Sequence, residues 1–557
     1  MSLYVSLKSL INSIVSFFEK KRLNILTLFL YIVFLSAARM WLEALLLNYP
    51  YKVISYEYLF VQIHITCFFI TSFIAGLVIL KFFSKTQLSK VANLTALGFT
   101  LVILPPFIDV FILNNPQPYT YGDPNWVINI YKLITFQLDE GFSAFYQGGE
   151  GIIYELFMIL FVASFYVLVK TKSILRTLGS AACFFVLFIF LGSPQINLFS
   201  GAAGQLIHPV FIVRCLIISI ILLIILLYLT KKELLKSFIK SSRLVTTAHF
   251  ALMTIIGVFI SGHILSRETV SISINDVVNL ILVFLRRMNP DQITVFIKYF
   301  IGNIGTFGIS VFVIVFIWQY AVMINHVYDE KIDSLNNKER VIPKKLLYKK
   351  QIKNIAIIYA IIALVLSVSL GIWSFLLTVF GLFLGTIYSV SPIRIRDTAF
   401  STMIIGAGST IAFFIGYMTP AYIQKMHGPN AGRIIYTYPG IPLQVLSVGL
   451  IIFIALTIGP LAKDYKDYQG DKKTGVKNLF TIYGIDKGIK IVSILLPFTF
   501  FMLILLFNSF VDILIFIPLG LLAGFLFYRF KKTEYIFALY FPVIIYCILR
   551  WFQIIQF

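Results

Sequence analysis

The chain of 557 residues alternates between long apolar segments and short polar ones. Many of the apolar segments reach about 20 residues, which is enough to cross a bilayer as a helix. They do not show the shorter, alternating pattern of outer-membrane strands, which runs over about ten residues. The pattern therefore predicts an all-α polytopic membrane protein with about fifteen transmembrane helices.

The expected spans form two groups, separated by the basic run at residues 231–243. The first group comprises residues 24–48, 58–80, 92–114, 151–170, 174–197 and 208–230. The second comprises residues 245–265, 298–324, 354–370, 373–391, 399–418, 441–461, 488–507, 511–528 and 535–553. We therefore predict an N-terminal membrane region at residues 1–240 and a second domain at 241–557. Residues 268–296 are expected to form an interfacial or re-entrant insert.

Charge supports this assignment and gives it an orientation. Charged residues make up 13% of the chain, against roughly 25% in soluble domains. Lysine and arginine total 46 and the acids 24, an excess that in a soluble protein would suggest nucleic-acid binding. Here the excess of lysine and arginine lies in short loops between apolar segments, and such loops mark the cytoplasmic side of a membrane protein. We predict a cell (inner) membrane protein whose N-terminus is cytoplasmic and whose C-terminus lies on the opposite side. We expect no cleavable signal peptide, because the first apolar run is long enough to span.

A few charged residues interrupt the first group of spans. Arg39 and Glu43 are four residues apart and are expected to pair, Asp109 follows two prolines, and Arg214 lies in the sixth span. Charges inside a membrane can mark transport pathways, although structural pairing is at least as common. A lipid or small-molecule transporter is therefore an alternative function. Against it, we find no internal repeat of the kind that transporters use.

Two acidic motifs follow apolar runs in the second group of spans. Asn325, Asp329 and Asp333 recur at four-residue intervals, so a continuing helix would place them on one face. Asp464, Asp467 and Asp471 are spaced three and four residues apart and would also share a face. Counting spans from a cytoplasmic N-terminus puts both motifs on the cytoplasmic side. Isolated acids at helix ends usually serve solvation, but two such clusters on one side of the membrane favour a shared site.

These residue types suit a metal-bound diphosphate. Mg²⁺ takes oxygen ligands and commonly binds through one or two carboxylates together with substrate phosphates. Nearby lysine and arginine would neutralise the remaining charge. A third segment, with Tyr388, Arg394 and Arg396 at the cytoplasmic end of another span, adds a phenol and two guanidiniums. The set predicts a site where a carbon–oxygen bond to diphosphate breaks.

With these motifs in place, residues of about 241–557 resemble the UbiA superfamily of intramembrane prenyltransferases. The NDxxDxxxD motif of that family is matched at Asn325, Asp329 and Asp333, with His326 in place of its first Asp. Its DxxDxxGDxxxG motif is matched at Asp464, Asp467, Gly470, Asp471 and Gly475. Its YSxxPxRxK element is matched at Tyr388, Ser389, Pro392 and Arg394, with Arg396 in the lysine position.

The resemblance implies a nine-helix bundle that transfers an isoprenyl group from an isoprenyl diphosphate to an aromatic or lipid acceptor, as in quinone or lipid biosynthesis. It implies Mg²⁺ as the cofactor and catalytic roles for Asp329, Asp333, Asp467 and Asp471. The span count places this active site on the cytoplasmic side. The metal ligands that it implies are Asn325, Asp329, Asp333, Asp464, Asp467 and Asp471. The diphosphate ligands are Asn325, Arg340, Tyr388, Arg394, Arg396 and Lys463.

Two departures from the family pattern leave alternatives open. His326 replaces an acid, which puts the number of metal ions in doubt and leaves an inactive diphosphate-binding scaffold as a further possibility. The first 240 residues lie outside the resemblance, and the sequence assigns them no function. The residues around the first motif resemble those of the chlorophyll, homogentisate and archaeal ether-lipid branches of the family more than those of haem O synthase.

Overall fold

The computed structural model confirms the all-helical membrane class. It describes residues 2–20, 23–47, 56–116, 120–121, 146–147, 150–192, 207–269, 290–330, 333–334, 338–426, 441–507 and 509–551. Within these residues, thirteen helices are long and apolar enough to cross a membrane. Two further helices contain shorter apolar stretches, at Ile174–Phe188 and Thr533–Cys547. Most of the insert expected at 268–296 lies outside the described residues.

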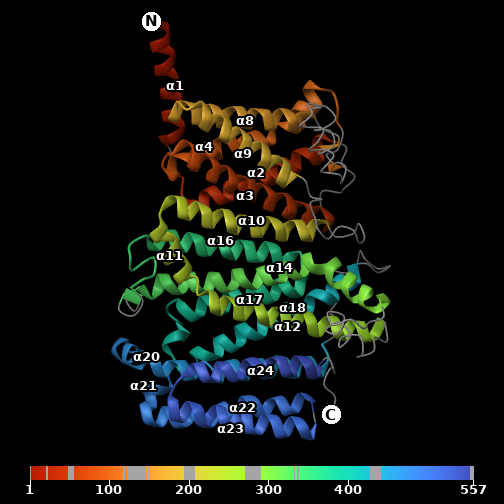
Figure 1. Cartoon of the computed structure of the whole chain (residues 1–557), viewed down its shortest axis with the longest axis vertical. Coiled ribbons are helices and arrows are strands. Elements are labelled where there is room, and N and C mark those ends of the chain that lie inside the picture. The colour runs from red at the N-terminus through yellow and green to blue at the C-terminus, as the bar shows by residue number, and fades with distance from the viewer. Residues whose placement is uncertain are drawn as a thin grey trace. The chain divides into compact units, whose positions relative to one another are not determined.

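The chain divides into two compact units, Met1–Lys236 and Ser237–Phe557, and the division falls within α11 (Lys232–Ser241). Figure 1 labels most of the helices of both units. Unit 1 contains α1 (Ser2–Lys20), α2 (Ile25–Leu46), α3 (Tyr56–Ser84), α4 (Leu88–Gly98), η1 (Phe99–Ile103), α5 (Pro105–Phe107), η2 (Ile108–Ile112), α8 (Glu150–Thr171), α9 (Ile174–Gly192) and α10 (Ile207–Thr230). It also has a two-residue antiparallel pair, β1 (Thr120–Tyr121) with β2 (Tyr146–Gln147).

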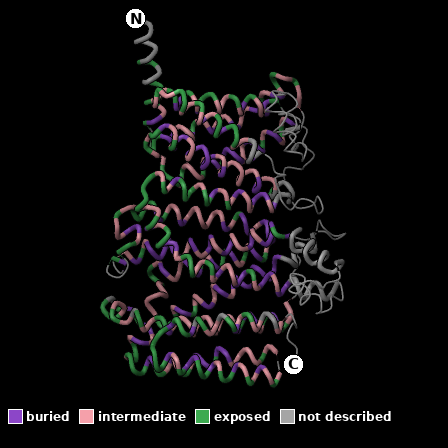
Figure 2. The backbone as a smooth tube through the Cα atoms, in the orientation of Figure 1, coloured by how far each residue is buried: buried purple, intermediate pink, exposed green. Residues whose placement is uncertain are grey.

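Unit 2 holds the acidic motifs. Its elements are α12 (Leu244–Thr269), α14 (Pro290–Tyr328), α16 (Lys349–Val368), α17 (Ile372–Ser389), η3 (Ile395–Asp397), α18 (Ser401–Met426), α19 (Leu443–Ile458), α20 (Leu461–Thr474), α21 (Leu479–Tyr483), α22 (Ile485–Phe507), α23 (Phe510–Phe530) and α24 (Thr533–Trp551). More than half of the spanning residues of α14 and α18 are buried, and Figure 2 shows buried residues along both helices. By contrast α23 exposes Leu514, Leu521 and Phe525, as a lipid-facing helix does.

The third span of unit 1 is irregular because of two prolines. Pro106 has no N–H to donate to the carbonyl of Val102, and the helix changes to a 3₁₀ turn before the prolines and a π turn after them. The Arg39 guanidinium donates to that carbonyl. Arg39 also pairs with Glu43, which confirms the predicted pair, and lies 3.5 Å from Glu155. The buried Asp109 carboxylate accepts a 2.7 Å hydrogen bond from the backbone N–H of Gly151, at the start of α8. These charges therefore have structural partners.

In unit 2, glycine allows α12 and α18 to touch backbone to backbone. A Cβ atom at Gly257 would lie 2.0 Å from the carbonyl oxygen of Phe413, and one at Gly416 would lie 1.9 Å from that of Thr254. Only a residue without a side chain fits at either position. This crossing fixes the face of α12 that lines the functional site.

Candidate functional site

Unit 2 contains a cavity of about 1070 Å³ whose lining changes from charged to apolar. The charged and polar lining comes from the residue before α12, the last turn of α14 and the segment after it, the end of α17 and the segment after it, and α20. Most of the apolar lining comes from α12, α19, the second half of α22 and α24. The cavity is therefore polar where helix ends meet and hydrocarbon-like where the helices cross the membrane.

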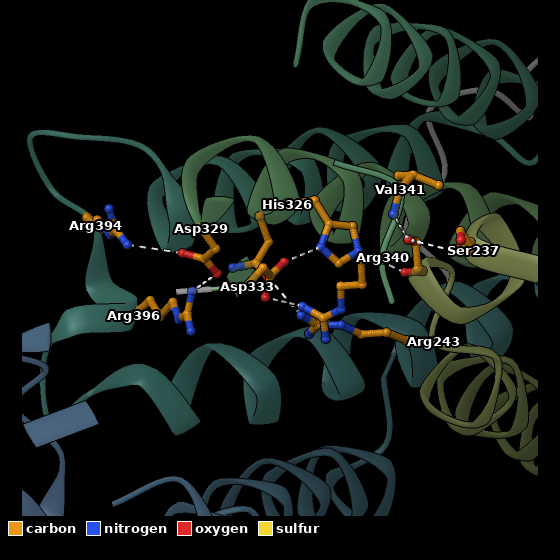
Figure 3. A network of polar contacts seen from close by, with 11 residues as sticks. Ser237, Arg243, His326, Asp329, Asp333, Arg340, Val341, Arg394 and Arg396 are labelled. Carbon is orange, nitrogen blue, oxygen red and sulfur yellow. Dashed lines mark hydrogen bonds and ion pairs between the residues drawn. The ribbon is translucent and has the colours of Figure 1, made fainter. Parts of the chain in front are cut away.

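The first acidic motif continues the helical hydrogen-bond pattern beyond α14. The N–H of Asp329 donates to the Asn325 carbonyl, and that of Asp333 donates to the Asp329 carbonyl, each at 2.8 Å. Asn325 and Asp333 line the cavity. Asp329 is not among the lining residues and is 1% exposed; it pairs with Arg394 at 3.0 Å and with Arg396 (Figure 3). Its carboxylate therefore holds the third segment against α14.

Asp333 is held from two sides. One carboxylate oxygen pairs with Arg340, and the other lies 3.1 Å from Nδ1 of His326 (Figure 3). Burial alone would raise the pKa of Asp333, but the hydrogen bonds from His326 and Arg340 and the charge of Arg340 outweigh it and hold that pKa below its ordinary value. This carboxyl group is therefore ionised at neutral pH.

His326, which replaces an acid of the family motif, is directed into the protein. It is 1% exposed, and its Nε2 donates to the backbone carbonyl of Ser241 at 2.9 Å. The Ser241 hydroxyl in turn accepts from the N–H of Val341 at 3.3 Å, next to Arg340. Nε2 donates to a carbonyl and Nδ1 donates to the ionised Asp333 carboxylate, so these contacts require both ring nitrogens to carry a proton. His326 therefore supplies no ligand to the cavity and instead links α11, α14 and the Arg340 loop.

The second acidic motif lies on α20, which is preceded by the N-cap residue Pro460 and ends where Gly475 adopts a left-handed φ of 77°. Asp464 and Asp471 line the cavity together with Lys463. Asp471 also accepts a 2.7 Å hydrogen bond from the side-chain amide of Asn478. The backbone of Asp467 lies in α20, but its side chain is outside the described structure.

The third segment lies beside both motifs. Tyr388 and Arg396 line the cavity, and Arg394, with a left-handed φ of 35°, pairs with Asp329 on one side and with Asp397 at 2.8 Å on the other. The N–H of Lys477 donates to the Asp397 carbonyl at 2.9 Å, which joins this segment to the loop after α20. The structure thus brings the three segments together around one cavity.

Sequence reasoning missed three cavity residues: Arg243, His249 and Trp318. Arg243 precedes α12 with a left-handed φ of 47° and donates to the Asn325 side chain at 2.9 Å. Burial, followed by the positive charge of Arg340, lowers the pKa of Arg243 to about 10. In the sequence, Arg243 is distinguished only as part of the basic run at residues 231–243, which we interpreted as a domain boundary. Nothing in the local sequence distinguishes His249 or Trp318.

The side chains of the two acidic motifs carry the oxygen atoms that Mg²⁺ requires as ligands, but these side chains do not form a cluster. Among the side chains that the structure describes, no group of three or more His, Cys, Asp and Glu residues is close enough to hold a metal ion. Figure 3 shows that Asp329 and Asp333 are each paired with arginine. Asn325, Asp333, Asp464 and Asp471 nevertheless present oxygen atoms to the same cavity. These residues fit a hard cation whose other ligands come from a phosphate.

Residues 295–536 match the model of the UbiA prenyltransferase family, which confirms the resemblance over that range. Digeranylgeranylglyceryl phosphate synthase of Saccharolobus solfataricus is 26% identical over 208 residues, which are 36% of this chain and 67% of that protein. The bacteriochlorophyll synthase 33 kDa chain of Rhodobacter capsulatus is 28% identical over 29% of this chain and 50% of its own length. A probable homogentisate phytyltransferase 2 of Oryza sativa is 28% identical over 30% of this chain and 42% of its own. The chain thus spans about half the length of several relatives that it matches.

Two solved structures are also similar to part of the chain. One is from a study of digeranylgeranylglyceryl phosphate synthase in membranes, with 21% identity, a TM-score of 0.37 and coverage of 57% of this chain and 97% of that one. Another is a UbiA homologue from Archaeoglobus fulgidus bound to DMAPP and Mg²⁺, with 17% identity, a TM-score of 0.32 and coverage of 40% and 73%.

Proposed function

We propose that the UbiA prenyltransferase family domain, together with the helices that complete its cavity, transfers an isoprenyl group from an isoprenyl diphosphate to a lipophilic or aromatic acceptor. The observation that carries this proposal is the division of the cavity into a charged part and an apolar part. An isoprenyl diphosphate has the same division between its head and its tail. Two relatives of this chain are named as a phytyltransferase and a prenyltransferase.

The charged part would bind the diphosphate. Arg340, Arg396 and Lys463 line it, together with Arg243. Guanidinium groups bind phosphate oxygens in pairs, and such charge-assisted hydrogen bonds are among the strongest in proteins. Asn325 and Tyr388 add uncharged donors. Arg394 would act indirectly. It pairs with Asp329, which also pairs with Arg396, and it thereby helps to position Arg396.

Mg²⁺ would be held by Asn325, Asp333, Asp464 and Asp471, with Asp467 as a further ligand from the second motif. Asp329 would support the site indirectly, through its pairs with Arg394 and Arg396. When bound, the ion supplies positive charge where the departing diphosphate becomes more negative. The protein supplies the orientation of its ligands: Arg340 and His326 fix the two oxygens of Asp333, and Asn478 fixes Asp471.

The apolar part would hold the isoprenyl chain and exclude water. Its walls include Met253, Ile256, Val448, Leu503 and Val543. An allylic cation formed in contact with water would be hydrolysed, so a dry wall beside the diphosphate protects the transfer reaction.

We also propose that this site faces the cytoplasm in the cell membrane. The segment that follows the first motif carries Lys338, Arg340, Lys344, Lys345 and Lys349. Such clusters beside a span stay on the cytoplasmic side. With the spans counted as expected, the N-terminus lies on that side and the C-terminus on the other.

The test is diphosphate release from geranylgeranyl diphosphate by the purified full-length protein in detergent, with Mg²⁺ and either an aromatic or a lipid acceptor. We expect release that depends on one acceptor and is lost on chelation of Mg²⁺. Asp471→Asn should abolish it, whereas Asp486→Asn, at an exposed position at the start of α22, should not. If folded protein releases nothing from any donor, the proposal fails and transport or an inactive scaffold becomes the better explanation.

A further inference from the structure

A histidine lines the apolar part of the cavity at a position where the proposed reaction needs a base. His249 lies on the cavity face of α12, with Ala248, Leu252, Met253 and Ile256 around it. It lies outside the matched family range. An ionisable side chain within a membrane span is costly unless it has a function or a partner.

The partner of His249 satisfies one ring nitrogen only. Nε2 lies 3.2 Å from the Ser409 hydroxyl on α18. That hydroxyl has one hydrogen and donates it to the carbonyl of Ile405 at 3.0 Å, so its oxygen accepts from His249. The proton of the imidazole is therefore on Nε2, and Nδ1 carries a lone pair. Within the described residues, no hydrogen-bond partner is present for Nδ1.

A second polar group lines the same cavity. Trp318 on α14 also lines the cavity, and the part of the chain that the structure describes offers no hydrogen-bond acceptor for its buried Nε1–H. Its ring stacks on Phe250, the neighbour of His249, with centroids 4.3 Å apart. The lining of the cavity thus includes one acceptor and one donor with no protein partner, which is the pattern that recognises a hydroxyl group.

The distance of both residues from the charged end of the cavity suits the expected position of the reacting carbon of the isoprenyl diphosphate. His249 is six residues beyond Arg243, which corresponds to about 9 Å along a helix. Trp318 is seven residues before Asn325, about 10 Å along α14, and two helical turns place it on the same face. A diphosphate at the charged end would leave its allylic carbon between that end and these two residues.

We propose that His249 is the general base that activates a hydroxyl group of the acceptor, and that Trp318 donates a hydrogen bond to the same acceptor. This inference rests on the proposed function. The hydroxyl oxygen forms a bond to the allylic carbon, the carbon–oxygen bond to diphosphate breaks, and its electron pair leaves with the diphosphate. The hydroxyl proton moves to Nδ1 of His249. The imidazolium returns this proton to water when the products leave.

The position of the base is rigid. The backbone contacts at Gly257 and Gly416 fix α12 against α18, and the Ser409 hydrogen bond fixes the ring. A base held in this way loses little entropy when the acceptor arrives. Ser409 is therefore a positioning residue that holds the tautomer, as an orienting group does for other catalytic histidines.

The test measures transfer from geranylgeranyl diphosphate to two acceptors, a glycerol-based lipid alcohol and a phenol of similar size. His249→Gln keeps an amide that can donate to Ser409 but has no basic nitrogen. We expect kcat to fall by about 10²- to 10⁴-fold with the alcohol. The fall should be smaller with the phenol, because its more acidic hydroxyl needs a base less. Donor affinity, measured by displacement of a fluorescent analogue, should be unchanged.

Two pairs of variants separate positioning from chemistry. Ser409→Ala should lower kcat, whereas Ser447→Ala should have no effect, because its hydroxyl also bonds a carbonyl four residues earlier but has no histidine partner. Trp318→Phe keeps the ring on Phe250 and should raise the KM for the acceptor more than it lowers kcat.

The ¹⁵N chemical shifts of the His249 ring provide a readout that does not depend on activity. We expect a protonated Nε2 and a bare Nδ1. Full activity of His249→Gln with the alcohol, or a proton on Nδ1, would overturn the inference while leaving the proposed function intact. If the wild-type protein transfers to neither acceptor, the proposed function fails, and this inference fails with it.

Discussion

The imidazole of His326 donates from Nε2 to the backbone carbonyl of Ser241 across 2.9 Å. The two residues are 85 positions apart, one at the end of α14 and the other at the end of α11. Through its other nitrogen His326 reaches Asp333. The last turn of α11 is therefore part of the structure that orients the acidic motif.

This contact predicts where unit 1 can be removed. A chain that begins at Lys231 keeps all of α11, whereas one that begins at Leu244 loses Ser241 and Arg243. We expect the longer chain to be monodisperse in detergent and to bind geranylgeranyl diphosphate. The shorter one should bind it at least tenfold more weakly, measured with the same displacement assay. Equal binding by both would show that α11 does not support the site.

Substitutions at His326 should distinguish orientation of Asp333 from metal binding. The amide of His326→Asn reaches the position of Nδ1 and can still donate to Asp333, while that of His326→Gln reaches the position of Nε2 and cannot. Loss of a group that orients a ligand typically weakens metal binding about 10- to 100-fold. We expect that effect on the Mg²⁺ requirement for His326→Gln and a smaller one for His326→Asn.

His326→Asp restores the residue of the family motif and is the sharpest control. Its carboxylate would face the carboxylate of Asp333 and the carbonyl of Ser241, so repulsion should lower activity. An Asp variant that needs less Mg²⁺ than the wild type would show that position 326 is a metal ligand after all.

The ion pairs of Asp329 should be important for stability. Its carboxylate is 1% exposed and faces Arg394 and Arg396. Breaking a buried pair by removing one charge costs about 3–5 kcal/mol, so Asp329→Asn should clearly lower the thermal unfolding temperature in detergent. Asp397 also pairs with Arg394, but 37% of its side chain is exposed. Asp397→Asn should therefore cost about 1 kcal/mol or less, and a similar loss in both variants would contradict the assignment.

The crossing of α12 and α18 gives a steric prediction. In Gly416→Ala the new Cβ would lie 1.9 Å from a backbone oxygen that cannot move aside. Overpacking of this kind costs about 1–3 kcal/mol or more. In Gly408→Ala the nearest atom is a ring carbon of Phe250 at 3.3 Å, which can shift. Thermal unfolding should show a large loss for the first variant and little change for the second.

Several features of this protein could be predicted from the sequence because they depend on local pattern. Apolar length gave the helical membrane class. The four-residue repeat of Asn325, Asp329 and Asp333 required only that a helix continue, and the backbone hydrogen bonds show that it does. The pairing of Arg39 with Glu43 followed from their spacing on one helix.

The tertiary structure decided which of these residues meet. Spacing made Asp329 and Asp333 equivalent, but two arginines 65 and 67 residues away hold the first outside the cavity, while the second lines it. His326 could have faced the cavity or the protein, and the Ser241 carbonyl determines which. Arg243, His249 and Trp318 carry no local signal, because their surroundings are built by other helices. A helical sequence fixes which side chains share a face, but only the packing of helices fixes what that face meets.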